Sequence, residues 1–324
     1  MSCTFKLFSK CQTTKFGCMV FMNQRLNISN TQNMLCPKED TYNKNTFYGG
    51  KNLKNWTQEE MEMLTETEKC LPLMETIMDS PLFIDDWEEM SKKNKDKYAV
   101  LSDVFSHDKI QSVSIILKNT IHPIKEAILN RWKKKKIEEL GEQGFLEYSK
   151  NILSEGHHLH KLIQDFLKKV ITIEDDGSAH WESMKPVLRE ISPDDVHCVE
   201  ADVNHPMLFY HGRLDCAIKY KNKLCIVDWK LATKRKDNLK DLYDAPYQVA
   251  AYVGAFNISK DSSEQVANAI IVQGYRDGSP ATVHYLNEFA LEFYWKGWLR
   301  RLARNHARKL NSQLTDDNSS QSKD

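Results

Sequence analysis

The sequence predicts an α/β fold in which a mixed central sheet is flanked by helices. Residues 212–230 contain two mostly apolar runs on either side of the polar pair Lys221–Asn222, which is the pattern of a β-hairpin. Residues 196–203 form a predicted strand that leads into this hairpin. Helical periodicity occurs before it, over residues 151–169, and after it, from Pro246 onward.

Composition limits the protein to a few broad classes. The 324 residues can bury a large core, and one domain with extensions is the natural expectation. Lys and Arg number 45, as do Asp and Glu, so any binding of a polyanion must come from local clusters. No apolar run is long enough to cross a membrane. The eight cysteines include no Cys-x-x-Cys pair, which argues against a zinc ribbon and favours a reducing compartment.

The N-terminal third of the chain shows no sign of chemistry. Residues 1–38 carry five basic residues and no acidic residue, as in an organellar transit peptide or an ordinary disordered tail. Residues 39–109 form a polar extension with mixed charge, interpreted as a partly disordered linker or a peripheral helical layer. Short helices are predicted near residues 57–68 and 81–90.

The remaining elements complete the predicted sheet and its covering helices. Residues 266–274 form a strand, and the Asp277–Gly278 turn leads to another strand at 282–286. The last helix spans roughly residues 288–310, and a disordered polar tail follows at 311–324.

Two carboxylates and an ammonium are predicted to meet on the hairpin. If Lys221 and Asn222 form the loop, antiparallel partners have numbers that sum to a constant, and Asp215 falls opposite Asp228. Like charges in that position are destabilising, and alternation places Lys230 on the same face. Mg²⁺ between the carboxylates would relieve their repulsion, which suits metal-assisted phosphodiester hydrolysis. The alternative is an exposed hairpin whose charges merely face solvent.

Several side chains outside the hairpin are candidates for DNA or metal binding. Arg131, Trp132 and Lys133 suit a phosphate backbone and a stacked base, or else a solvated helix face. Ser112 and Ser114 precede a helix-like stretch, where hydroxyls either cap the helix or contact a phosphate. The helix at 151–169 carries histidines, which are structural or serve as metal ligands.

This order of elements, with these residues on it, resembles the RecB-like branch of the PD-(D/E)xK nuclease superfamily. Its members share a helix histidine, an Asp on the second strand, an Asp/Glu-x-Lys on the third strand and a Gln-x-x-x-Tyr on the next helix. The matching positions here are His160, Asp215, Asp228 with Lys230, and Gln248 with Tyr252.

Five stretches look like the exonuclease family of mitochondrial genome maintenance in particular. The similarity covers roughly residues 110–305 and makes residues 110–310 a PD-(D/E)xK nuclease domain. It implies a metal-dependent exonuclease of the mitochondrial matrix that trims single-stranded DNA, flap ends included. The stretches that carry the similarity are residues 131–133, 139–145, 223–230, 248–255 and 277–281.

The resemblance also implies a role for each matching residue. Mg²⁺ or Mn²⁺ would be held by His160, Asp215, Asp228 and the Trp229 carbonyl. Lys230 would orient the attacking water and stabilise charge in the transition state, helped by Gln248 and with Tyr252 packed beneath. Glu200, on the preceding strand, would join the outer coordination of the metal or be purely structural.

Two departures from the family pattern affect this prediction. Leu231–Ala232 replaces the usual Thr-Ser after the catalytic Lys, so a hydroxyl is missing. Arg213 stands where an apolar residue is common, and it either contacts a phosphate or crowds the metal. The rival functions are an endonuclease of the same superfamily, an inactive nuclease-like module that binds nucleic acid, and a structural protein with solubilising basic clusters.

Overall fold

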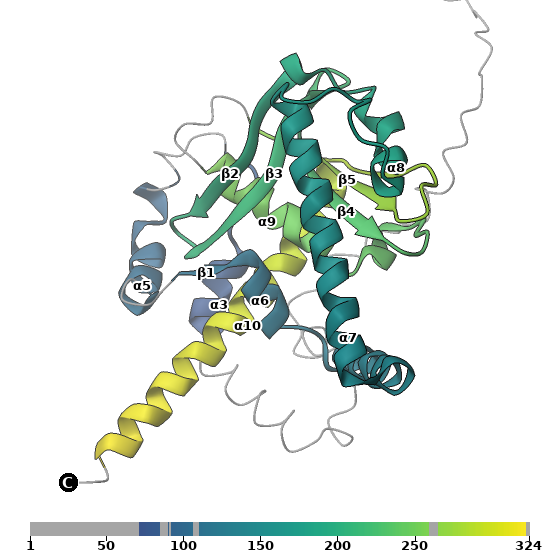
Figure 1. The fold of residues 1–324 in the computed structure, drawn as a ribbon. Helices are drawn as coiled ribbons and strands as arrows, with labels where there is room; N and C mark the ends of the chain where they lie inside the picture. Colours follow the sequence, from purple (N-terminus) through teal and green to yellow (C-terminus); the bar gives the residue numbers. More distant parts are fainter. Residues whose placement is uncertain (1–70, 85–89, 91, 106–109, 259–264, 322–324) are drawn as a thin grey trace, which may run out of the picture. The chain divides into compact units, whose positions relative to one another are not determined.

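The structure, a computed structural model, describes most of the chain from Leu71 onward (Figure 1). The predicted transit peptide or tail at 1–38 and the helix predicted at 57–68 lie outside the described residues. The ranges that are not described are 1–70, 85–89, 91, 106–109, 259–264 and 322–324.

A six-stranded mixed sheet forms the centre of the fold, as predicted. The main path of neighbouring strands is β1-β3-β4-β5-β6, and β2 pairs with β3. Strand β3 is antiparallel to β2 and β4, β4 is parallel to β5, and β5 is antiparallel to β6. The strands are β1 (Gln111–Ser112), β2 (Val196–His205), β3 (Tyr210–Tyr220), β4 (Lys223–Ala232), β5 (Asn268–Tyr275) and β6 (Thr282–Leu286).

Helices cover both faces of the sheet. Among the described residues, none of these helices combines the length and the apolar character needed to cross a bilayer. The α-helices are α3 (Leu71–Met78), α5 (Lys95–Phe105), α6 (Val113–Asn119), α7 (Pro123–Leu167), α8 (Ala179–Leu188), α9 (Ala245–Asn257) and α10 (Glu288–Gln321). The 3₁₀ turns are η2 (Pro193–Asp195) and η3 (Leu239–Leu242).

The hairpin between β3 and β4 has the predicted loop and register. Lys221 and Asn222 both have positive φ, 50° and 62°, as a type I′ turn requires. Ile218 pairs with Cys225 and Tyr220 with Lys223, which is the predicted register. This register fixes which side chains share a face of the sheet.

The two faces of the hairpin have different neighbours. Cys216, Val227 and Trp229 belong to one buried cluster with apolar side chains of α7 and α8. Strand alternation turns Asp228 and Lys230 to the opposite face. Helix α9 lies on that side of the sheet, away from α7 (Figure 1). The charged pair therefore lies under a helix, which contradicts the picture of a hairpin whose charges face solvent.

Helix α7 is two helices joined at Gly141, whose φ of 71° and ψ of 167° are not helical. In a straight helix Trp132 and Phe145 would be about 20 Å apart, at 1.5 Å per residue. Their ring centroids are 6.3 Å apart, so the two segments fold back on each other. The predicted start of a helix at residue 151 was too late, because the second segment already begins after Gly141. Gly156 lies inside this segment and does not interrupt it.

The polar extension contributes to the same domain as the sheet. Ile77 on α3 is fully buried, and the indole nitrogen of Trp295 on α10 donates to the Ser80 carbonyl at 2.8 Å. Asn257 donates to the Leu82 carbonyl at 3.4 Å. The domain thus includes residues before 110. Of the helix predicted at 81–90, residues 81–84 are described and are not helical.

Two helix assignments differ from the sequence analysis. Helix α8 was not predicted, and it docks through Ser183, whose hydroxyl accepts from the Tyr275 amide at 2.8 Å. Helix α10 continues past the predicted end at Leu310 to Gln321, since extending an existing helix needs no new nucleus. The tail predicted from residue 311 therefore begins within a helix.

Candidate active site

The carboxylate of Asp215 lies in a gap beside β3, largely buried. Strand β4 pairs with residues 216–220 of β3, and β1 pairs with residues 210–211. Strand β2 occupies the other side, so residues 212–215 have no neighbour among the described strands on the β4 side. Asp215 fills this fork and accepts a hydrogen bond from the Trp229 amide at 2.8 Å.

Asp215 and Asp228 share the fork rather than a regular rung of the ladder. The last paired residues of the hairpin are Cys216 and Val227, one step short of the predicted Asp215–Asp228 pair. The two carboxylates nevertheless repel each other, and this repulsion contributes to a raised pKa at Asp215. Asp215 and Asp228 are therefore neighbours, as predicted, although regular pairing of β3 and β4 ends one residue before them.

Lys230 holds Asp228 in place but leaves one carboxylate oxygen without a hydrogen bond. Asp228 is 1% exposed, and the Lys230 ammonium lies 2.8 Å from each of its oxygens. Only Oδ1 is placed to accept a hydrogen bond, so Oδ2 is buried without a hydrogen-bond partner. Such an atom is costly unless a further group, such as a cation, binds it.

Lys230 stays charged despite its burial. Burial alone would lower the pKa of the Lys230 ammonium, but the charges of Asp228 and Asp215 raise it above its ordinary value. The side chain is consequently a fixed positive charge at neutral pH. It is suited to stabilise negative charge and cannot act as a general base.

His160 reaches the fork from the second segment of α7. Its Nε2 lies 3.0 Å from the Trp229 carbonyl oxygen, and its Nδ1 lies 3.6 Å from Asp215 Oδ1. With the proton on Nε2, that nitrogen donates to the carbonyl, and the Nδ1 lone pair faces Asp215. Metal-ligating histidines are held in this way. The Trp229 carbonyl, predicted as a metal ligand, thus orients the imidazole.

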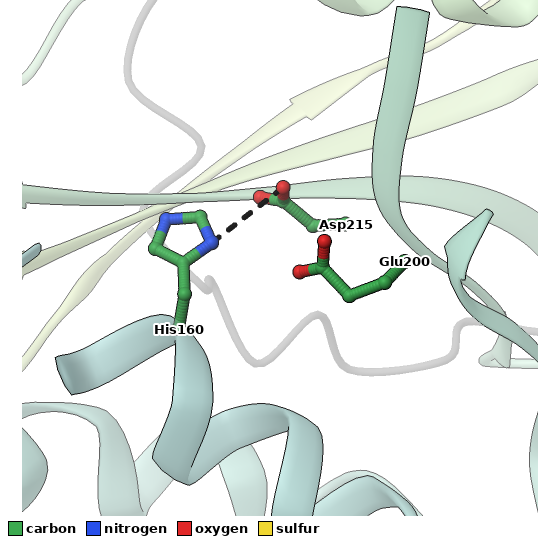
Figure 2. A group of neighbouring side chains, drawn as sticks. All are labelled: His160, Glu200 and Asp215. Atoms are coloured by element: carbon green, nitrogen blue, oxygen red, sulfur yellow. Dashed lines mark ion pairs between the residues drawn. The ribbon is translucent and has the colours of Figure 1, made fainter. Parts of the chain in front are cut away.

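Glu200 completes a group of three potential ligands (Figure 2). The pairs Val199–Cys216 and Ala201–Leu214 place Glu200 opposite Asp215 on β2. Its φ of 51° is unusual for a residue other than glycine, and strained backbone of this kind is concentrated at functional sites. One donor atom each from His160, Glu200 and Asp215 lie within 4.8 Å of one another.

The charges of the site match a divalent cation. Three carboxylates and one ammonium leave an excess of two negative charges when all are ionised. Burial, followed by the charge of Asp228, raises the pKa of Asp215 to about 6. Carboxylate oxygens with one imidazole nitrogen suit Mg²⁺ and Mn²⁺.

Gln248 and Tyr252 lie on α9, on the face of the sheet that carries Lys230. Gln248 Nε2 donates to the Tyr252 hydroxyl at 2.7 Å, so the amide is held by the tyrosine. Burial raises the pKa of Tyr252 to about 12, which keeps the phenol neutral. The Tyr252 ring covers Gly212, where an added Cβ would lie 2.5 Å from ring atom Cε1.

We expect Gly212→Ala to displace Tyr252 and with it Gln248. The new methyl group would overlap the ring, and overpacking of this kind costs about 1–3 kcal/mol. Urea unfolding should show the loss. Gly156→Ala is the matched control, because no atom lies within 4 Å of its added Cβ. A helical Gly→Ala change should stabilise by about 0.5–1 kcal/mol, so equal effects of the two variants would contradict this account.

The residues predicted to bind DNA occupy separate places. Ser112 is the N-cap of α6 and accepts from the Ile115 amide at 3.3 Å, while Ser114 is exposed on the same helix. Arg213 forms a two-point ion pair with Asp202 on β2, at 2.8 and 3.1 Å. The guanidinium is thereby held against β2 by Asp202.

The basic cluster lies on the first segment of α7. Arg131 and Lys133 are exposed, and Trp132 is 43% exposed. The Lys133 ammonium is 5.9 Å from the centre of the Phe145 ring, beyond the reversal at Gly141. The cluster therefore combines exposed cations with a partly open indole.

Comparisons with known proteins identify similar sequences. No family model matches the chain. The mitochondrial genome maintenance exonuclease 1 of Mus musculus is 40% identical over 60% of this chain and 58% of its own length. The Homo sapiens protein of that name is 36% identical over 63% of this chain and 60% of its own length. The Xenopus tropicalis protein is 37% identical over 72% of this chain and 64% of its own length. The chain thus spans about three fifths of the length of these relatives.

A solved structure adds little to this result. The crystal structure of SSO0001 covers 67% of this chain and 85% of its own, with a TM-score of 0.28 and 15% identity, which is too low to support an argument. The sequence matches are far stronger. This chain is therefore a sequence relative of the mitochondrial genome maintenance exonucleases.

Proposed function

We propose that this protein is a metal-dependent exonuclease that hydrolyses single-stranded DNA from its ends, flap ends included, during maintenance of DNA in the mitochondrial matrix. The cluster of His160, Glu200 and Asp215, with the Asp228–Lys230 ion pair close to Asp215, carries the proposal. The names of the relatives supply the exonuclease activity and the compartment. Phosphodiester hydrolysis needs both a cation site and a fixed positive charge.

Each residue of the site has one task in this proposal. Mg²⁺ or Mn²⁺ would be held by His160, Glu200, Asp215 and Asp228. The Trp229 carbonyl would keep the His160 imidazole in place. When bound, the ion supplies a Lewis acid and lowers the pKa of a coordinated water. Lys230 stabilises the charge that develops on the phosphate oxygens. Tyr252 holds Gln248 beside the site, where its amide can orient the water.

The DNA strand would be bound by groups that surround the fork. Arg131, Trp132 and Lys133 provide cations and a stacking surface on α7. Ser114 and Arg213 are exposed polar groups suited to phosphate contacts, whereas the Ser112 hydroxyl is occupied as a helix cap. Binding of this kind depends on salt, because each neutralised phosphate releases counterions.

Digestion of end-labelled single strands, linear and circular, with Mg²⁺ or with a chelator, tests the proposal. We expect linear DNA to be degraded only with the metal and circular DNA to remain intact. Cleavage of the circles would identify an endonuclease instead. Binding without cleavage of either substrate would identify a nuclease-like binding module, and neither binding nor cleavage would favour a structural protein.

Metal binding should depend on pH through Asp215. Because its pKa is raised to about 6 in the metal-free fold, against about 3.9 in an unfolded chain, the folded protein holds this proton more tightly. The resulting stability is present below about pH 4 and is lost as the pH rises through about 6. A bound cation needs the ionised carboxylate, so binding releases the proton in this window.

We therefore expect millimolar Mg²⁺ to raise the Tm more at about pH 7.5 than at about pH 5. Thermal melts with Mg²⁺ and with chelator measure the difference. Calorimetry in two buffers of different ionisation enthalpy measures the released proton directly. An equal rise in Tm at both pH values would contradict this role for Asp215.

A further inference from the structure

Tyr243 is an exposed aromatic side chain in the loop that joins two parts of the candidate active site. The loop begins after β4, which carries Lys230, and ends at α9, which carries Gln248. Tyr243 is 68% exposed. A single exposed aromatic residue is ordinary on a protein surface, so its conformation and neighbours decide whether it has a role.

The backbone of Tyr243 is strained. Its φ of 56° and ψ of −111° correspond to the first central position of a type II′ turn, where Gly, Asn or Asp is expected. A bulky side chain in this conformation costs stability that a glycine would not. The fold therefore tolerates an unfavourable residue at a place where its ring reaches solvent.

A lysine covers the ring from within the same loop. The Lys236 ammonium lies 3.7 Å from the centre of the Tyr243 ring, close enough for a cation–π interaction. Burial lowers the pKa of Lys236, while the nearby Asp241 carboxylate raises it in part. This contact fixes the ring, and most of the tyrosine surface stays open to solvent.

The loop lies at the edge of the sheet where the catalytic side chains are found. Strand β4 ends at Ala232, two residues or about 7 Å beyond Lys230, and β5 runs parallel to it. The Arg276 amide, just after β5, donates to the Ala232 carbonyl at 3.2 Å. Ligands of α/β sheets bind beyond the carboxyl ends of parallel strands, and the loop starts there.

We propose that Tyr243 is a platform on which a nucleobase of the single-stranded substrate stacks, with Lys236 beside it to attract the phosphate backbone. This inference rests on the proposed function for the nature of the substrate. A rigid ring with neighbouring cations is the combination that binds single strands without sequence preference. The strained backbone is retained because it presents the ring.

Three variants separate the ring from the backbone. Tyr243→Gly removes the ring and relieves the strain, Tyr243→Phe keeps the ring, and Phe289→Ala removes another aromatic side chain that is 80% exposed. Fluorescence anisotropy with a labelled single strand, in chelator, measures affinity without cleavage. Thermal melts of each variant measure stability.

We expect Tyr243→Gly to weaken binding by about 5- to 150-fold, the usual range for loss of one stacked base. Its Tm should be equal to that of the parent or higher. Tyr243→Phe and Phe289→Ala should bind as the parent does. Parent-like affinity of Tyr243→Gly, or an equal loss in Phe289→Ala, would overturn the proposal.

The same measurements distinguish failure of this inference from failure of the proposed function. A parent protein that binds single strands but does not cut them would refute the exonuclease, and the anisotropy series would still test stacking. A parent that cuts while Tyr243→Gly binds equally well would refute stacking alone. A parent that neither binds nor cuts would refute both.

Discussion

Replacing Asp228 with asparagine is expected to reduce digestion of single-stranded DNA by more than about 100-fold. Changing a residue that only hydrogen-bonds to a metal ligand typically lowers metal affinity or activity by about 10- to 100-fold. Asp228 is itself a proposed ligand, so its loss should have a larger effect. The amide has nearly the shape of the carboxylate but carries no charge to balance a divalent cation. It also removes the main counter-charge of the buried Lys230 ammonium.

The loss should affect chemistry and metal binding more than binding of DNA. Anisotropy in chelator should detect continued binding of the labelled strand, and circular dichroism should show the parent fold. The rise in Tm on addition of Mg²⁺ should shrink. Digestion by purified Asp228→Asn at a rate near that of the parent would contradict the proposed role. Asp194→Asn is a suitable control, because it changes an exposed carboxylate that pairs with Lys169.

Replacing Lys230 with methionine is expected to reduce digestion by roughly 100- to 1,000-fold, as loss of one transition-state donor does in other enzymes. Methionine keeps an unbranched chain but cannot stabilise the charge that develops on the phosphate. The carboxylates remain, and without the ammonium their mutual repulsion increases. The pKa of Asp215 should consequently rise further in the metal-free protein.

The response to metal distinguishes the two variants. Lys230→Met should keep or enlarge the rise in Tm caused by Mg²⁺, because the cation relieves a stronger repulsion. Asp228→Asn should reduce it. A Lys230→Met protein that retained parent activity, or that no longer responded to Mg²⁺, would show that the lysine acts as a structural support for the carboxylates.

The strand pattern predicted the hairpin that carries Asp215, Asp228 and Lys230. A two-residue polar break between apolar runs is sufficient to set the hairpin register, and alternation then fixes the faces of Asp228 and Lys230. His160 followed only from the family resemblance, since its approach to Asp215 depends on how α7 packs over the sheet. Periodicity within one element contains no such information.

Other features depend on contacts that sequence patterns do not encode. Glu200 has a positive φ within β2, and no glycine at that position indicated it. The reversal at Gly141 could have been suspected from the glycine, but helical periodicity continues on both sides. Helix α8 was missed because Pro186 lies inside it, which normally argues against a helix.

The hydrogen bond between Trp295 and Ser80 joins residues 215 positions apart in the chain. Synthesis proceeds from the N-terminus, so the Ser80 carbonyl is left without its Trp295 donor until α10 has been made. Contacts between such distant residues also form slowly. Until then, apolar side chains of α3 such as Ile77 lack the cover that α10 provides, which leaves the newly made chain open to association with other chains.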